Sequence, residues 1–256
     1  MKKIRIFGVC VVMFSILTCQ KEDNQREVVP LLVSQNENWL SANLDAKFAS
    51  SQKQVAAYLF STDEMKLLIQ KPNIAEVHFV MGFNDDKIQI QVSGVDESGT
   101  ELGTVKSAIL KESNFRTELT NLNQLSVNTT NKRTPLLNSH LLSPDNAFKW
   151  IKEWQGKLKV VSDLEKITSH EGSRFRYFSL EPEVIKAMLY KDYVNIGLFL
   201  GLNPKGKVTA ILIGLDQNNA VKKIAINPKE ANDIYDGTRP CPPCIDEETE
   251  EQINRK

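Results

Sequence analysis

Two stretches of alternating hydrophobic and polar residues lie more than a hundred positions apart and predict the same local structure. In the first, MGFNDDKIQIQVSGVDESG from Met81, apolar Ile88, Ile90 and Val92 alternate with polar residues. The second, LGLNPKGKVTAILIGLDQN from Leu200, repeats the order of strand, turn and strand. Alternation with one polar face is typical of an antiparallel sheet that is covered on one side. Each stretch therefore predicts a β-hairpin.

Helical spacing of apolar residues precedes both hairpins. Trp39, Leu40, Leu44 and Phe48 predict a helix over about 36–48. Further helix starts are expected at Ser61, Ser143 and Glu181. Ser61-Thr62-Asp63-Glu64 has the form of a capping box, and Ser143 is followed by Pro in the first helical position.

The two halves share one frame of Phe-Ser, helix, strand, Gly-x-Asn turn, Lys-led strand and Gly-x-Asp turn. Its offset is 118 residues at Phe60/Phe178, 119 at Gly82/Gly201 and 120 at Asp96/Asp216. Agreement of several features in one order indicates a tandem duplication. We therefore expect an α+β fold of two tandem related domains, each a helix-backed antiparallel β-meander.

The predicted domains are residues 31–117 and 140–240. An Asn-, Thr- and Ser-rich stretch at 118–139 is expected to be a linker between them. Residues 241–256 hold a cysteine pair and a charged tail without apolar periodicity.

The outer face of the second predicted sheet is more apolar than that of the first. Gln89, Gln91 and Ser93 of the first copy correspond to Thr209, Ile211 and Ile213, and Phe199 lies on the same face. Either the helix at 144–156 or the insertion at 157–173 covers this face, or it contacts the other domain or a partner. In the second case Phe199, Ile211 and Ile213 would be the contact residues, since large apolar patches are rare on monomers.

The N-terminus has the form of an export signal. MKKIR is basic, and the apolar run at 7–17 is too short to span a bilayer as a helix. Ile16-Leu17-Thr18-Cys19 resembles the lipobox of bacterial lipoproteins, with Thr18 in place of the usual Gly, Ala or Ser. That resemblance implies a signal peptide at 1–18, acylation of Cys19, and a lipidated tether at 19–30 that holds the protein to a membrane.

Gln20-Lys21-Glu22-Asp23 resembles a tag that sends some Gram-negative lipoproteins to the outward face of the outer membrane. The alternative is a cleaved, soluble periplasmic protein. Composition is that of a globular protein, and 32 basic residues balance 32 acidic ones. No basic stripe with interleaved aromatic residues is present, so we expect no nucleic-acid partner.

Cysteine usage agrees with an oxidising compartment. Cys10 would leave with the signal peptide and Cys19 would carry lipid, so Cys241 and Cys244 are expected to form a local disulfide. Cys241-Pro242-Pro243-Cys244 also resembles the CPPC motif of secreted thioredoxin-like proteins. Redox activity and a metal half-site are the alternatives, although redox chemistry requires the first Cys at a helix N-terminus.

The Gly-Val-Asp hairpin and the Pro-Cys-Pro-x-Cys segment together resemble small uncharacterised proteins of Gram-negative bacteria, a resemblance that implies no activity. Gly201–Lys207 nearly spells a phosphate-binding loop, but Val208 replaces the required Ser or Thr and a strand follows. We expect a hairpin turn there.

The remaining candidates for chemistry are scattered. His78, His140 and His170 lack metal-ligand spacing. Asp85, Asp86, Asp96 and Asp216 lie on predicted turns, where Asp is common. We therefore expect no catalytic residue, no cofactor and no metal.

The function favoured by these patterns is a lipid-anchored, outward-facing binding or assembly module without enzymatic activity. One alternative is an envelope hydrolase with a site between the two domains, which convergence of Asp85, Asp96 or Asp216 with a histidine would indicate. Another is a thiol–disulfide protein that uses the cysteine pair.

Overall fold

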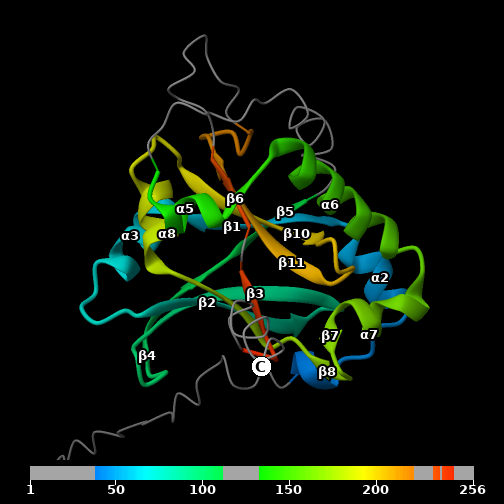
Figure 1. Ribbon diagram of the computed structural model, residues 1–256. Helices are drawn as coiled ribbons and strands as arrows, with labels where there is room; N and C mark the ends of the chain where they lie inside the picture. Colours follow the sequence, from blue (N-terminus) through cyan, green and yellow to red (C-terminus); the bar gives the residue numbers. More distant parts are fainter. Residues whose placement is uncertain (1–37, 112–132, 222–232, 237, 245–256) are drawn as a thin grey trace, which may run out of the picture.

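The computed structural model describes residues 38–111, 133–221, 233–236 and 238–244 (Figure 1). Two antiparallel sheets enclose one apolar core. Sheet A has the order β5-β1-β10-β11-β12-β6, formed by Ala108–Lys111, Val55–Ser61, Asn195–Leu202, Val208–Leu215, Ile234–Tyr235 and Leu141–Leu142. Sheet B has the order β13-β9-β2-β3-β4, formed by Arg239–Cys241, Tyr177–Leu180, Glu76–Asn84, Lys87–Val95 and Glu101–Lys106.

The helices lie around the two sheets (Figure 1). They are α2 (Ala46–Gln52), α3 (Thr62–Ile69), α5 (Pro135–Ser139), α6 (Pro144–Lys157), α7 (Leu164–Ile167) and α8 (Pro182–Leu189). A 3₁₀ turn at Val161–Asp163 precedes α7, and a small ribbon pairs β7 (Ser169–His170) with β8 (Ser173–Arg174).

Neither sheet belongs to one half of the chain. The first half contributes the meander β2-β3-β4 to sheet B and the ribbon β5-β1 to sheet A. The second half contributes the meander β10-β11-β12 to sheet A and the ribbon β13-β9 to sheet B. Each ribbon extends the other half's meander through the antiparallel pairs β1–β10 and β9–β2.

The predicted α+β class is confirmed, but the predicted division at 31–117 and 140–240 does not describe two separately folded domains. One cluster of buried side chains holds Phe79 and Ile90 of the first half together with Leu198 and Leu212 of the second. The reason is that each ribbon buries its apolar face against the other half, so neither half closes a core alone.

Strand pairing also corrects the register of the repeat. Tyr58 lies opposite Ile109 and Leu198, whereas Phe178 lies opposite Pro240 and Phe79. Tyr58 is therefore the counterpart of Phe178, with an offset of 120, which is also the offset between the starts of α3 and α8. The expected Phe60/Phe178 match is therefore wrong by two residues. A shift of two residues keeps every side chain on the same face of the strand, so the hydrophobic pattern does not reveal it.

The turns of the two halves use the same local bonds. Asp96 Oδ1 accepts hydrogen bonds from the backbone N–H groups of Ser98 and Thr100, both at 2.9 Å. Asp216 Oδ1 accepts from the two equivalent N–H groups, at 2.8 and 3.0 Å. Both aspartates are thus turn caps, as their position in the sequence predicts.

The hairpin turns differ in length. Asp85 and Asp86 have φ values of 51° and 56°, as a two-residue type I′ turn requires. The second hairpin turns through 203–207, with Gly206 at φ 70°. The segment that resembles a phosphate-binding loop is therefore a hairpin turn, as predicted.

Two helix predictions need correction. The helix expected over 36–48 is interrupted, because Asp45 caps a new helix by accepting from the N–H groups of Lys47 and Phe48. Ser61 precedes α3, but its side chain makes no capping bond with a described residue, so the capping-box prediction is wrong. Ser61 ends β1, and Thr62 Oγ1 instead donates to Tyr193 O at 3.0 Å.

Helix α6 starts at its predicted cap and covers the outer face of sheet A. Ser143 Oγ accepts from Asn146 N–H at 3.3 Å. Phe199, Ile211 and Ile213 are 0% exposed and share an apolar cluster with α6. The helix therefore covers this face, which is the first of the two alternatives, and these three residues belong to the core and are not exposed for a partner.

Part of the predicted linker is folded. Residues 133–139 include helix α5, and Arg133 forms an ion pair with Asp233 in which both side chains are buried. The predicted signal peptide, the tether at 19–30 and most of the tail at 241–256 lie outside the described residues.

Candidate functional site

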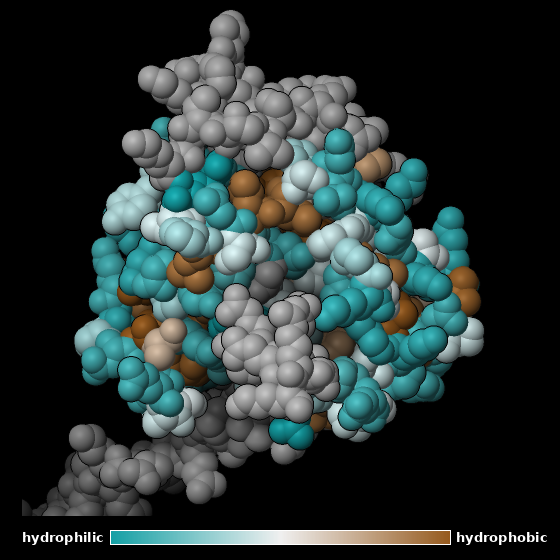
Figure 2. All heavy atoms as spheres, in the orientation of Figure 1, coloured by the Kyte–Doolittle hydropathy of each residue, from teal (hydrophilic) through white to brown (hydrophobic). Residues whose placement is uncertain are grey.

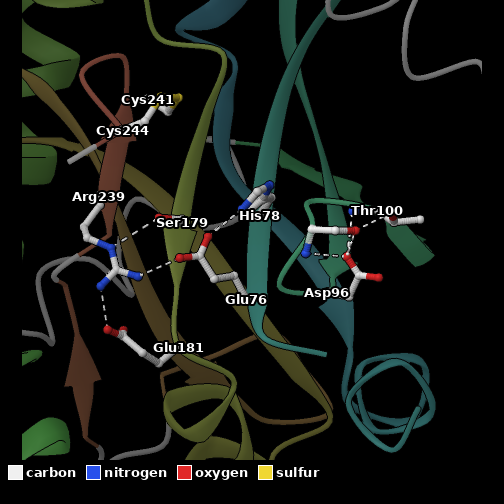
Figure 3. Close-up of polar contacts among 10 residues, drawn as sticks. Glu76, His78, Asp96, Thr100, Ser179, Glu181, Arg239, Cys241 and Cys244 are labelled. Carbon is white, nitrogen blue, oxygen red and sulfur yellow. Dashed lines mark hydrogen bonds and ion pairs between the residues drawn. A yellow bond between two sulfur atoms is a disulfide. The ribbon is translucent and has the colours of Figure 1, made fainter. Parts of the chain in front are cut away.

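A chain of polar side chains, an arginine, two glutamates and two histidines, lies on the side of sheet B that faces away from the core, across β13, β9 and β2 (Figure 3). Alternation along β2 and β9 directs Val77, Phe79 and Phe178 inward and places the polar residues between them on the outer side. We call the five linked residues Glu76, His78, His140, Glu181 and Arg239 the sheet-B network.

Arg239 is the centre of the network. Its Nη1 lies 2.5 Å from Glu181 Oε1, and its Nη2 lies 3.4 Å from Glu76 Oε1. The second oxygen of each carboxylate faces a histidine, with Glu76 Oε2 2.8 Å from His78 Nε2 and Glu181 Oε2 3.0 Å from His140 Nε2. Each glutamate therefore bridges the arginine and one histidine.

Burial strengthens these contacts unevenly. The side chain of His140 is 8% exposed and that of Glu181 24%, whereas that of Glu76 is 43% exposed. The contact with His140 and then that with Arg239 lower the pKa of Glu181 to about 2, against the opposing effect of burial. The inner half of the network is therefore the stronger.

His78 also stacks on an aromatic ring. Its ring centroid lies 4.1 Å from that of Tyr177 on the neighbouring strand, with an interplanar angle of 11°. Burial, followed by the nearby Glu76 carboxylate, raises the pKa of Tyr177. An aromatic ring and an arginine thus lie on the same part of the sheet.

The network continues as a row of polar residues across sheet B. The row consists of Arg239, Ser179, His78, Ser93 and Thr104, each directly opposite the next. Arg239 Nε donates to Ser179 Oγ at 3.3 Å, and Ser93 Oγ donates to Glu101 at 2.7 Å. The outer face predicted from Gln89, Gln91 and Ser93 is polar and extends over both halves of the chain, but the expectation that water covers it is wrong for Gln91 and Ser93, whose side chains are buried.

The cysteine pair lies at the end of the same edge strand. A disulfide joins Cys241 and Cys244. Cys241 ends β13 opposite Tyr177, and its carbonyl accepts from Arg176 N–H at 2.7 Å. Because Cys241 ends a strand and does not start a helix, the position differs from that of a redox dithiol.

The residues proposed for a hydrolase do not come together. Asp96 and Asp216 are held by their own turns, and Asp86 pairs with Lys47 at 2.8 Å. Within the described part of the chain, no hydrogen bond or ion pair joins Asp85, Asp96 or Asp216 to a histidine. Convergence of one of these aspartates with a histidine would have favoured the hydrolase alternative.

Sequence reasoning named His78 and His140 as isolated residues and did not connect them. The structure joins them through Glu76, Glu181 and Arg239, although Glu76 and Arg239 are 163 positions apart. No local pattern marks such a pair. Only the order of strands in sheet B brings the two positions together.

A second polar cluster closes sheet A. Asp233, with a side chain that is 8% exposed, pairs with Arg133, with Lys191 Nζ at 3.2 Å and with the Tyr235 hydroxyl at 3.1 Å. Burial acts to raise the pKa of Asp233, but the bonds from Arg133 and Lys191 outweigh it, so the pKa is lowered. The cluster connects three segments that are separate in the sequence, and we expect it to stabilise the fold.

Comparison with protein-family models, with curated proteins and with solved structures finds no match for this chain. Among the described residues, none of the helices combines the length and the apolar character needed to cross a membrane. The His, Cys, Asp and Glu side chains of the same residues form no group of three or more that could hold a metal ion.

Proposed function

We propose that the protein is a lipid-anchored outer-membrane module that binds a protein partner through the outer face of sheet B. The observation that carries the proposal is the polar outer side of sheet B, where Arg239 and Tyr177 are partly exposed on adjacent strands and Thr104 is exposed at the β4 edge. Ser93 and Ser179, which lie between them in the row, are buried. Arginine and tyrosine are enriched where protein interfaces make their strongest contacts. The corresponding face of sheet A is covered by α6 and is apolar.

The exposed β4 edge of sheet B is polar. Figure 2 shows hydrophilic residues over most of the face in view, with hydrophobic residues in small separate groups. Thr104 and Lys106 are exposed at the β4 edge of sheet B. A partner with complementary donors and acceptors fits this surface better than an apolar one.

The membrane part of the proposal rests on the N-terminal sequence. Cys19 in the lipobox-like Ile-Leu-Thr-Cys would carry the acyl chains, and residues 20–37 separate it from the first described residue. A segment of this length gives the folded part reach from the membrane. Labelled palmitate should be incorporated into the native chain and not into Cys19→Ala.

Binding is tested with matched arginine substitutions on the two sides of the molecule. Thr104→Arg changes the polar row, and Asn146→Arg adds the same charge on exposed α6. A partner recovered by the native protein from envelope extract is purified, and its dissociation constant is measured with each variant. We expect at least about tenfold weaker binding for Thr104→Arg only. Equal affinities, or no partner with measurable affinity, would contradict the proposal.

A further inference from the structure

The two halves of the chain complete each other's sheets in the same way. We label five strands of each half a to e in chain order, so that they are β1, β2, β3, β4 and β5 in the first half and β9, β10, β11, β12 and β13 in the second. In both sheets, strands e and a of one half extend the three strands b, c and d of the other half. The short segment between strands d and e, where the chain passes from one sheet to the other, also bonds to an equivalent residue in each half. Ser107 Oγ donates to Ile90 O at 2.6 Å, and Thr238 Oγ1 accepts from Ala210 N–H at 3.3 Å. Ile90 and Ala210 are equivalent positions with an offset of 120.

Contacts between the halves are those of a protein interior. Four residue pairs join β1 to β10 and four join β9 to β2, while α3 packs against α8. Trp39 Nε1 donates to Phe175 O at 2.7 Å, and Arg239 reaches Glu76. The surface between the halves therefore resembles an obligate interface, in which two chains bury a common core.

The halves are joined covalently by one stretch of 21 residues, 112–132. The disulfide between Cys241 and Cys244 lies wholly within the second half. If the first half of one molecule combined with the second half of another, every strand pair and core contact would be reproduced. The two arrangements would then differ only in the entropy of the connection.

We propose that the surface between the halves is an exchangeable interface whose partner is a second copy of this chain. Residues 38–111 of one copy combine with the half from 133 onward of another, giving a dimer with two complete folds. Joining two halves within one chain gives an effective concentration of about millimolar. The single chain is therefore favoured in dilute solution, and exchange increases as the local concentration rises.

Single cysteines placed on opposite strands test the proposal in the intact chain. Ser61 and Asn195 are directly opposite each other in β1 and β10. Thr62 N–H bonds to Val194 O, so the adjacent Ser61–Asn195 pair is of the non-hydrogen-bonded kind. In such pairs the Cα atoms are about 4.5 Å apart, which a disulfide can span.

Ser61→Cys and Asn195→Cys chains, both in a Cys19→Ala background, are unfolded together, refolded and oxidised. We expect a cross-linked heterodimer whose yield rises between about 10 μM and about 1 mM protein, the range set by the effective concentration of the connection. The double variant should close the bond within one chain at low concentration. A mixture of Ser61→Cys with Ser98→Cys is the control, since Ser98 lies on an exposed turn of the first half.

The proposal is overturned if the heterodimer never exceeds the Ser98→Cys control while the double variant closes its own bond. Failure of the double variant to close would contradict the β1–β10 pairing, and with it the proposal. Both outcomes are independent of whether the outer face of sheet B binds a partner.

A second experiment removes the connection after folding. A protease site is inserted between residues 112 and 132, and two versions with different terminal tags are cut and mixed. Random re-pairing of equal populations predicts that about half of the recovered complexes combine a half of one tagged version with a half of the other. Uncut mixtures at about 10 μM, well below the effective concentration of the connection, should show almost none. Separation and precipitation of the halves, or permanent association without exchange, would contradict the proposal.

Discussion

Glu181 connects the edge strand β13 with the segment before β6, and its replacement by glutamine tests the sheet-B network. The substitution removes the negative charge and keeps the size of the side chain. Oε1 of Glu181 lies 2.5 Å from Arg239, and Oε2 lies 3.0 Å from His140. Glu181→Gln therefore weakens the charge-assisted hydrogen bond from Arg239 and removes the negative charge that faces His140.

The magnitude follows from the pKa of Glu181, which is about 2 in the folded protein against an ordinary value of 4.5. That difference corresponds to about 3 kcal/mol of stabilisation of the folded state by the ionised carboxylate. Water reaches 24% of the side chain and screens its contacts. We therefore expect Glu181→Gln to lower the free energy of unfolding at pH 7 by about 2 kcal/mol.

The pH dependence gives the prediction a sign. Because the folded-state pKa lies below the unfolded value, the stabilisation is complete well above pH 4.5 and is lost as the pH falls towards 2. Urea unfolding followed by circular dichroism should show the full difference between native and variant protein at pH 7. At pH 3 that difference should have fallen to about half or less.

Glu183→Gln is the matched control on the same helix. Glu183 pairs with Lys186 at 3.4 Å, and about half of each side chain is exposed. This exposed pair should contribute no more than about 0.5 kcal/mol. The reasoning is refuted if the two variants are equally stable at pH 7, or if the loss caused by Glu181→Gln is the same at pH 7 and pH 3.

Three further predictions concern the core and the edge of the fold. Asp233→Asn should lower the free energy of unfolding by about 3–5 kcal/mol in urea titrations, because it removes the carboxylate that pairs with Arg133 and Lys191. A loss below about 1 kcal/mol would contradict a stabilising role for this cluster. Gly214→Ala should lower the free energy of unfolding by about 1–3 kcal/mol, because the added methyl group meets the rigid ring of Tyr193. Gly94→Ala at the equivalent position should cost less, because there the methyl group meets the flexible end of a side chain. Equal losses of stability would count against this packing. The native protein should not reduce insulin disulfides faster than Cys241→Ser does, while that variant should lose about 2 kcal/mol of stability by opening a short covalent loop.

Local features of this fold were predictable because the interactions that form them span only a few residues. The Asp96 and Asp216 turns bond to N–H groups two and four positions ahead, and Ser143 caps α6 three positions ahead. Alternation likewise predicted both hairpins. Where a local pattern had a competing long-range partner it failed, as at Thr62, which bonds to Tyr193 in place of a capping box.

By itself, the sequence determined the two central hairpins, the turns capped by Asp96 and Asp216, the start of α6 and the similar order of these features in the two halves. The tertiary structure decided which strands become neighbours, and that decision placed β1 beside β10 and Arg239 beside Glu76 and Glu181. An apolar alternating strand buries the same area in either sheet, so its pattern carries no information about its partner. The choice depends on how both halves close one core, and the sheet-B network exists because of that choice.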